Sequence, residues 1–205
     1  LVETIYQALF AGSEYVTAVP LLIYLSYEED YSFLEEVSDE LLGGYSRRTA
    51  VLQDDTNDGD SEGMYTSVMC RDEYAFSTAP QLEDRTADGV PDPMQDALAG
   101  GGVELFELCA NWEAGAADQR ENAAVVSDIP TLIIVGEYDP ATPPVWGELT
   151  VQTLSNGRLY IIPNEGHSLL SANECAIDLT NSFIADPLAE LDDQCVRQTA
   201  ALEFE

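Results

Sequence analysis

The chain has 205 residues, of which 39 are acidic and 7 basic, and its formal net charge is −32. Such a surface repels nucleic-acid phosphates and anionic lipid, so neither is an expected partner. The 45% of hydrophobic residues argues against disorder, and no apolar run reaches the length of a membrane span. We attribute the charge to adaptation to high salt, in which counterions screen the repulsion between acidic groups.

The first part of the chain predicts short amphipathic helices and no strand. The first helix has its apolar stripe at Val2, Ile5, Tyr6, Leu9 and Phe10. It is predicted to end at Gly12. Pro20 stands at the start of a second apolar segment, Leu21–Tyr27. A third helix is predicted from about Tyr31 to Leu42, ending at Gly43 and Gly44.

An acidic loop follows at residues 54–63. Its last five residues match the Gly-x-Ser-x-Gly pattern around Ser61, but no buried strand precedes them, so Ser61 is not the predicted nucleophile. The loop also resembles a calcium loop, yet Thr56 and Tyr65 stand at the third and twelfth positions, where carboxylates belong. We therefore predict a solvated loop.

The next segment, Met64–Met69, is predicted to be a strand that ends at Cys70 and two acids, Asp72 and Glu73. Residues 77–102 are rich in Pro, Asp, Ala and Gly and predict mainly loop. A helix is predicted from Val103 to Cys109.

Residues 130–169 predict one βαβ unit. Thr131–Val135 and Arg158–Ile162 are short apolar strands, and Val145–Leu154 between them has helical character. The crossover makes the two strands parallel and adjacent, so Asp139 and His167 emerge at the same carboxyl edge. Open α/β sheets carry their chemistry at that edge.

A carboxylate beside an imidazole fixes the ring tautomer and stabilises the imidazolium that forms when histidine takes a proton from a nucleophile. Asp139 and His167, the only histidine of the chain, are therefore the candidate catalytic acid and base. The alternative is a histidine with satisfied hydrogen bonds and an aspartate that caps a helix.

The last part of the chain predicts an amphipathic helix at Ser171–Ala185, ended by Asp186 and Pro187. The chain has four cysteines, no Cys-x-x-Cys and one histidine, so we expect no metal site. Two disulfides, and hence an exported protein, are the preferred interpretation, with free buried thiols as the alternative.

Two runs of sequence carry a family resemblance. Gly136-Glu-Tyr-Asp139-Pro-Ala-Thr-Pro-Pro144 and Pro163-Asn-Glu-Gly166-His167-Ser168 resemble the acid and histidine segments of α/β-hydrolases. They are most similar to the C-terminal part of the tripeptidyl aminopeptidase-like (TAP-like) group, relatives of the proline iminopeptidases. Cys109-Ala-Asn-Trp112 resembles the Cys-x-x-Trp that precedes the acid strand in that group.

The resemblance implies an α/β fold: the C-terminal portion of an α/β-hydrolase sheet with a helical cap segment. Residues 1–63 would be the cap segment and acidic loop, and residues 64–205 the C-terminal part of the core. We count three predicted strands, too few for such a sheet, so the N-terminal strands are expected to be absent from this chain.

The resemblance also implies roles for particular residues. It pairs Cys70 with Cys109 and Cys175 with Cys195. Asp72 or Glu73 would bind the free α-amino group of a substrate; the alternative is a pair of solvated acids.

The predicted function is that of a serine hydrolase, an exo-acting peptidase of the tripeptidyl or prolyl aminopeptidase kind, acting on short peptides. Asp139 and His167 would serve a nucleophilic serine in the N-terminal part of the same hydrolase, the expected partner, so this chain alone is expected to be inactive. No cofactor is expected, and the location is extracellular or in the cell envelope. The alternatives are an esterase, lipase or epoxide-type hydrolase, or a non-catalytic interaction domain derived from the fold.

Overall fold

The structure is a computed structural model that describes residues 1–11, 13–51, 61–83, 102–167, 169–200 and 202. It divides into two compact units. The first contains Leu1, Glu3–Asp54 and Ala124–Glu205, and the second contains Val2 and Asp55–Ala123. The predicted boundary between cap and core, at residues 63 and 64, concerns the parts of a hydrolase and stays a prediction.

The first unit begins with helices, as predicted. They are α1 (Val2–Ala11), α2 (Ser13–Val16), α3 (Val19–Tyr27) and α4 (Ser32–Val51). Each buries at least one apolar side chain: Ala8, Val16, Leu22 and Val37. The predicted end of the third helix at Gly43 and Gly44 is wrong. α4 continues past both glycines and extends to Val51.

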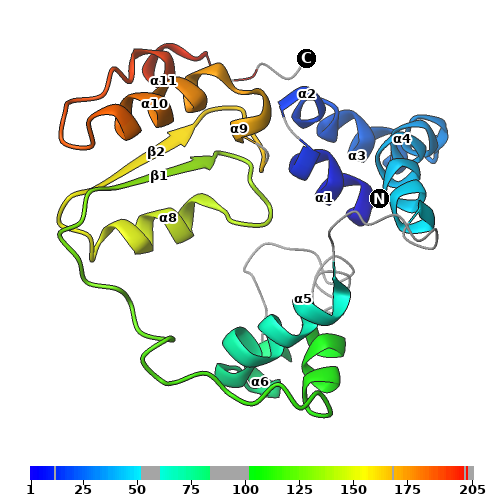
Figure 1. The fold of residues 1–205 in the computed structure, drawn as a ribbon. Helices are drawn as coiled ribbons and strands as arrows, with labels where there is room; N and C mark the ends of the chain where they lie inside the picture. The colour runs from blue at the N-terminus through cyan, green and yellow to red at the C-terminus, as the bar shows by residue number, and fades with distance from the viewer. Residues whose placement is uncertain (12, 52–60, 84–101, 168, 201, 203–205) are drawn as a thin grey trace. The chain divides into compact units, whose positions relative to one another are not determined.

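A two-stranded parallel sheet forms the rest of the first unit (Figure 1). Strands β1 (Thr131–Gly136) and β2 (Gly157–Ile162) pair from Thr131 opposite Gly157 to Gly136 opposite Ile162, as the βαβ pattern predicts. Helix α8 (Pro144–Val151) packs on one face of the sheet. A Cβ atom added to Gly147 would lie 2.8 Å from Cδ1 of Leu159 and 3.4 Å from Cγ2 of Ile133, so the helix lies close to both strands at this glycine.

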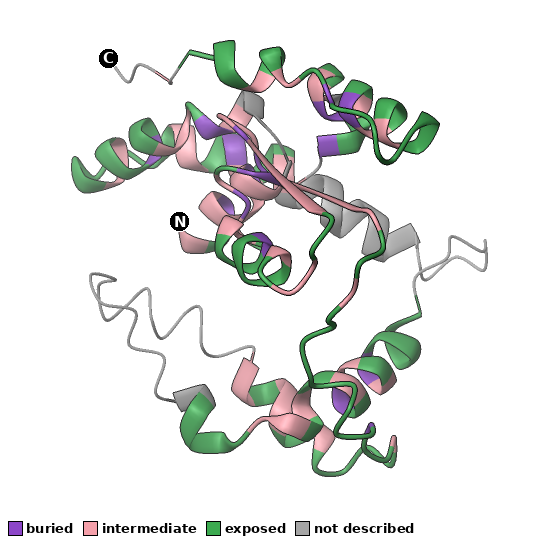
Figure 2. Ribbon diagram, turned by 90° about the vertical axis from the view of Figure 1, so that its left-hand side faces the viewer, coloured by how far each residue is buried: buried purple, intermediate pink, exposed green. Residues whose placement is uncertain are grey.

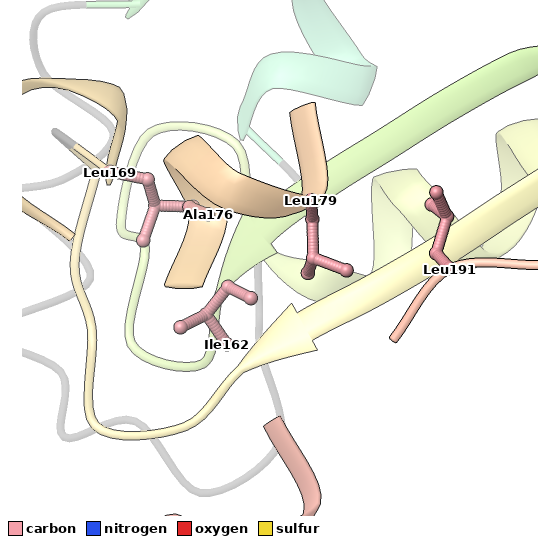
Figure 3. Close-up of a cluster of buried hydrophobic side chains, with 5 residues drawn as sticks. All are labelled: Ile162, Leu169, Ala176, Leu179 and Leu191. Atoms are coloured by element: carbon pink, nitrogen blue, oxygen red, sulfur yellow. The ribbon is translucent and has the colours of Figure 1, made fainter. Parts of the chain in front are cut away.

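The opposite face of the sheet carries the apolar core. Helices α9 (Leu169–Ala172), α10 (Glu174–Ala185) and α11 (Gln194–Gln198) follow β2. The core cluster, drawn in Figure 3, consists of Ile162, Leu169, Ala176, Leu179 and Leu191. The single helix predicted from Ser171 is in fact two, because Asn173 caps α10 by accepting a hydrogen bond from the Ala176 N–H at 2.9 Å.

The two strands are only partly buried in spite of their apolar sequences. Val135, Gly136 and Ile162, at their carboxyl ends, are buried, and the earlier strand residues are intermediate. Figure 2 shows both strands mostly in the intermediate colour. With two strands in the described residues, the sheet leaves part of its apolar surface open.

The second unit is helical throughout its described elements. It contains α5 (Glu62–Val68), a π-helix (Met69–Glu73), a 3₁₀ turn (Tyr74–Phe76), α6 (Ala79–Glu83) and a helical segment at residues 102–109. The helix predicted from Val103 to Cys109 is thus confirmed, and Cys70 and Cys109 form a disulfide that joins it to the π-helix. The second disulfide, Cys175–Cys195, links α10 and α11, so both pairings implied by the resemblance are confirmed.

The strand predicted at Met64–Met69 is wrong. Ser61 accepts a hydrogen bond from the Met64 N–H at 3.2 Å and so caps α5, and Glu62 lies in the first turn, where the helix dipole favours an acid. A single strand also needs a pairing neighbour, and no strand is found in the described part of this unit. Most of the acidic loop, residues 54–60, lies outside the described residues, so its solvated conformation stays a prediction.

No helix in the described part of the chain is long and apolar enough to cross a membrane.

Candidate active site

The candidate site lies where the loops after β1 and β2 meet. β1 ends at Gly136 and leads to Asp139, and β2 ends at Ile162 and leads to His167. The Nδ1 atom of His167 lies 3.0 Å from Oδ1 and 2.9 Å from Oδ2 of Asp139. The βαβ unit therefore brings the two side chains within hydrogen-bond distance, as predicted from the order of the elements.

Asp139 is almost completely buried, with 5% of its surface exposed, yet its carboxylate is well supplied with hydrogen bonds. Oδ1 accepts from the Ala141 N–H at 2.9 Å and from the Thr142 N–H at 2.8 Å, and Oδ2 accepts from the Thr142 hydroxyl at 2.7 Å. Burial by itself would raise the pKa of Asp139. The hydrogen bonds from Thr142, His167 and Ala141 outweigh burial and hold that pKa below its ordinary value of 3.8.

Asp139 is consequently ionised, and its carboxylate accepts hydrogen bonds from the backbone N–H groups of Ala141 and Thr142 in the turn that it begins. It does not cap the following helix, because the N-cap position of α8 is Pro143. This excludes half of the alternative interpretation, in which Asp139 was a helix cap.

The ionised carboxylate determines where the proton of the neutral histidine lies. A carboxylate can only accept hydrogen bonds, so Nδ1 of His167 carries the hydrogen and donates it to Asp139. The other ring nitrogen, Nε2, is then unprotonated and has a free electron pair. One third of the side chain is exposed, which leaves the ring accessible to a reacting group.

The two loops are fastened to each other by their backbones. The Tyr138 N–H donates to the Glu165 carbonyl at 2.9 Å, and the Glu137 N–H donates to the Ile162 carbonyl at 3.0 Å. A Cβ atom added to Gly136 would lie only 2.1 Å from the Gly166 carbonyl oxygen. Only glycine fits here, so the end of β1 lies directly against the loop that carries His167.

Side chains brace the histidine loop from outside. Glu137 accepts a hydrogen bond from the N–H of Asn164, which has a left-handed backbone with φ of 67°. The Asn173 side chain, which caps α10, also donates to Glu165 at 2.7 Å. The position of His167 therefore depends on both the acid loop and the start of α10.

Helix α1 reaches the same histidine. The rings of Phe10 and His167 are stacked with their centroids 4.5 Å apart and an angle of 27° between their planes. The backbone N–H of His167 donates to the carbonyl of Leu9 at 3.3 Å.

A cleft of about 710 Å³ opens beside the acid and the histidine. Besides Asp139, Thr142 and His167, it is lined by residues of β1, α9 and α10, most of them apolar: Leu132, Ile134, Leu169, Leu170, Ser171, Thr180 and Phe183. Among the described residues, no group of three or more His, Cys, Asp or Glu side chains is placed to hold a metal ion.

The other residues singled out from the sequence belong to the second unit. Asp72 and Glu73 lie in the π-helix rather than at the end of a strand. Asp72 is partly buried and lies 3.6 Å from the Arg71 guanidinium, whereas Glu73 is exposed. Their role in binding an α-amino group stays a prediction. Ser61 serves as the cap of α5.

Two contributors to the site were missed in the sequence. Thr142 supplies two of the hydrogen bonds on Asp139, and the signal was present, because Asp-x-x-Thr is a pattern in which the acid closes a turn on the following backbone amides. Phe10 had no such signal, because it lies 157 positions before His167 and was expected only to pack within its own helices.

A parallel βαβ unit whose two loops bring an aspartate and a histidine together is compatible with a fragment of an α/β-hydrolase. Comparison with known proteins agrees: residues 100–195 match the family described as "TAP-like protein". The chain is also 27% identical over 158 residues to a protein of Leptolyngbya boryana named "Probable proline iminopeptidase". The family match and this relative both support a likeness of the chain to the C-terminal part of a TAP-like α/β-hydrolase.

The match to the Leptolyngbya protein covers 73% of this chain but 46% of the relative, so the chain spans less than half of that protein. No solved structure is significantly similar to the chain.

Proposed function

We propose that this chain supplies the acid and the general base of a serine hydrolase, an exo-acting peptidase of the tripeptidyl or prolyl aminopeptidase kind. The nucleophilic serine would lie in the N-terminal part of the same hydrolase. The observation that carries the proposal is the Asp139–His167 pair, whose 2.9 Å contact leaves Nε2 unprotonated at the carboxyl edge of a parallel sheet.

In the complete enzyme, Nε2 of His167 takes the proton of the serine hydroxyl as that oxygen attacks the scissile carbonyl. The same nitrogen then gives the proton to the leaving amine. Asp139 keeps Nδ1 protonated throughout and stabilises the transient imidazolium. It can do so because its hydrogen bonds keep it ionised despite its burial.

Two observations support a nucleophile elsewhere. Ser61, the serine in a Gly-x-Ser-x-Gly pattern, caps a helix start instead of following a strand. The half-buried strands also suit a sheet that continues into another part of the protein, and the relative from Leptolyngbya is more than twice as long as the matched portion. An exported protein fits the two disulfides, which persist in oxidising surroundings.

The test uses the complete hydrolase that contains this chain. Tripeptide amides with a free amino terminus should be hydrolysed, N-acetylated peptides much more slowly, and a fluorophosphonate should label one serine. Asp139→Asn should lower kcat by about 10⁴-fold, because the amide holds the ring in the wrong tautomer. A matched control is Asp118→Asn, which changes an exposed acid paired with Arg120 and should leave the rate unchanged.

The outcomes separate the proposal from its rivals. Rapid hydrolysis of acyl esters with no cleavage of peptide amides would assign the acid and base to an esterase or lipase. A complete protein with no reactive serine and no hydrolysis would instead be a binding domain. An Asp139→Asn variant as active as Asp118→Asn would remove Asp139 from the mechanism.

A further inference from the structure

Three aromatic rings form a continuous stack that ends on the candidate base. Tyr6 and Phe10, four residues apart on α1, have ring centroids 6.2 Å apart and planes inclined by 24°. Phe10 then stacks on His167 at 4.5 Å. A phenyl ring therefore covers one face of the imidazole.

The edge and the face of the imidazole are thus held by different parts of the chain. Asp139 holds the Nδ1 edge with a hydrogen bond, which fixes that nitrogen but still permits the ring to tilt. Phe10 contacts the face of the ring and limits that tilt. The hydrogen bond from the His167 N–H to the Leu9 carbonyl fixes the backbone of the histidine relative to the same helix end.

We propose that Phe10 is a positioning residue for His167, holding the plane of the imidazole so that Nε2 points toward the reacting atoms. This inference rests on the proposed function for its catalytic meaning, but the contact itself can be tested without any substrate. It gives α1 a role in positioning the candidate base.

The stack also places the face of a phenyl ring against the imidazole that carries a positive charge during the proposed proton transfer. The face of a phenyl ring attracts a cation within about 6 Å of its centroid, and the imidazolium exists only while His167 holds the proton of the nucleophile. Asp139 and Thr142 lie at Nδ1 of the ring, 2.9 Å and 3.4 Å away, whereas Phe10 contacts its face. Phe10 therefore acts on the transition state more than on substrate binding.

The first experiment is NMR of the 205-residue chain, whose single histidine gives ring signals that need no assignment by mutation. Phe10→Leu keeps an apolar side chain but removes the ring. The Cε1–H and Cδ2–H signals of His167 should lose the upfield shift caused by a stacked phenyl ring, and its Nδ1–H should exchange faster with water. Phe10→Tyr, which keeps the ring, should restore both signals.

Gln7→Ala is the matched control, because it changes α1 one turn away at a side chain that bonds to Glu3. It should leave the His167 signals where they are. If Phe10→Leu moves those signals no more than Gln7→Ala does, Phe10 does not position the ring.

The second experiment measures rates in the complete hydrolase. Phe10→Leu should lower kcat about two- to five-fold with KM unchanged, and Phe10→Tyr should restore kcat. An unchanged kcat, or a change confined to KM, would overturn the positioning role. Altered NMR signals in a protein with no hydrolytic activity would refute the proposed function but leave the ring contact established.

Discussion

Replacing Gly136 with alanine should disturb the geometry of the candidate site. The new Cβ would lie 2.1 Å from the Gly166 carbonyl oxygen and 2.5 Å from that of Glu165, whereas ordinary contacts begin at 3.4 Å. The shortfall of about 1.3 Å must be absorbed by backbone, because no flexible side chain is involved. The loop that carries His167 therefore has to move.

A movement of that size exceeds what the Asp139–His167 hydrogen bond tolerates. Lengthening the present 2.9 Å contact by even 1 Å breaks it. We expect Gly136→Ala to lower the free energy of unfolding by about 1–3 kcal/mol, the usual cost of overpacking. In the complete hydrolase, misplacing a catalytic group by about 1 Å should lower kcat by about 10²-fold.

Gly63→Ala provides the comparison, because the added Cβ there has no neighbour closer than 4.0 Å. It should be neutral or slightly stabilising, since it lies within α5. Thermal unfolding gives the stability of both variants, and the His167 ring signals give the geometry. If Gly136→Ala unfolds at the same temperature as Gly63→Ala and leaves the histidine signals unchanged, the close fit of the two loops is not what positions His167.

Three further predictions concern charge. Thr142→Val should lower the free energy of unfolding by about 1.5–3 kcal/mol at pH 7, because it removes the hydroxyl that bonds the buried Asp139 carboxylate. Folding lowers the pKa of Asp139, so the stabilisation from its ionised carboxylate is present above the ordinary value of 3.8 and is lost as the pH falls through the folded-state pKa. Urea unfolding at lower pH should therefore show a smaller difference in stability between the variant and the wild type. Thr142→Ser should behave as the wild type, and a difference that does not change with pH would contradict this account. With a net charge of −32, the melting temperature should rise between dilute buffer and molar salt; a flat profile would remove the idea of adaptation to salt. In the complete hydrolase, Asp72→Asn or Glu73→Gln should raise KM for peptides with a free amine but not for blocked esters, and an equal effect on both substrates would exclude a role in binding the amine.

The sequence predicted best those parts of the fold that depend on local pattern and on chain topology. The apolar runs at Thr131–Val135 and Arg158–Ile162, separated by a helix, allow essentially one arrangement, because a parallel pair needs a crossover of that length. The proximity of Asp139 and His167 follows from this arrangement. The caps at Ser61 and Asn173 were readable in principle, but their effect on neighbouring elements was underestimated.

What could not be predicted depends on contacts between distant segments. Met64–Met69 has no strong preference of its own, and its conformation is set by the Ser61 cap and by what surrounds it. The stack of Phe10 on His167 needs α1 and the histidine loop to meet, and no periodicity in either segment encodes that meeting. The close approach at Gly136 was likewise invisible, because a glycine that ends a strand reads only as a turn.

The unpaired side of β1 has a practical consequence for handling the chain in isolation. The N–H groups of Thr131 and Glu137 bond toward β2, so by alternation those of Leu132 and Ile134 point to the other side, where the described residues provide no strand. Such an edge is a template on which a second copy can pair, and the large negative charge opposes that encounter. Concentrated salt screens this repulsion between copies. The high salt that stabilises the fold therefore also promotes aggregation of the isolated chain.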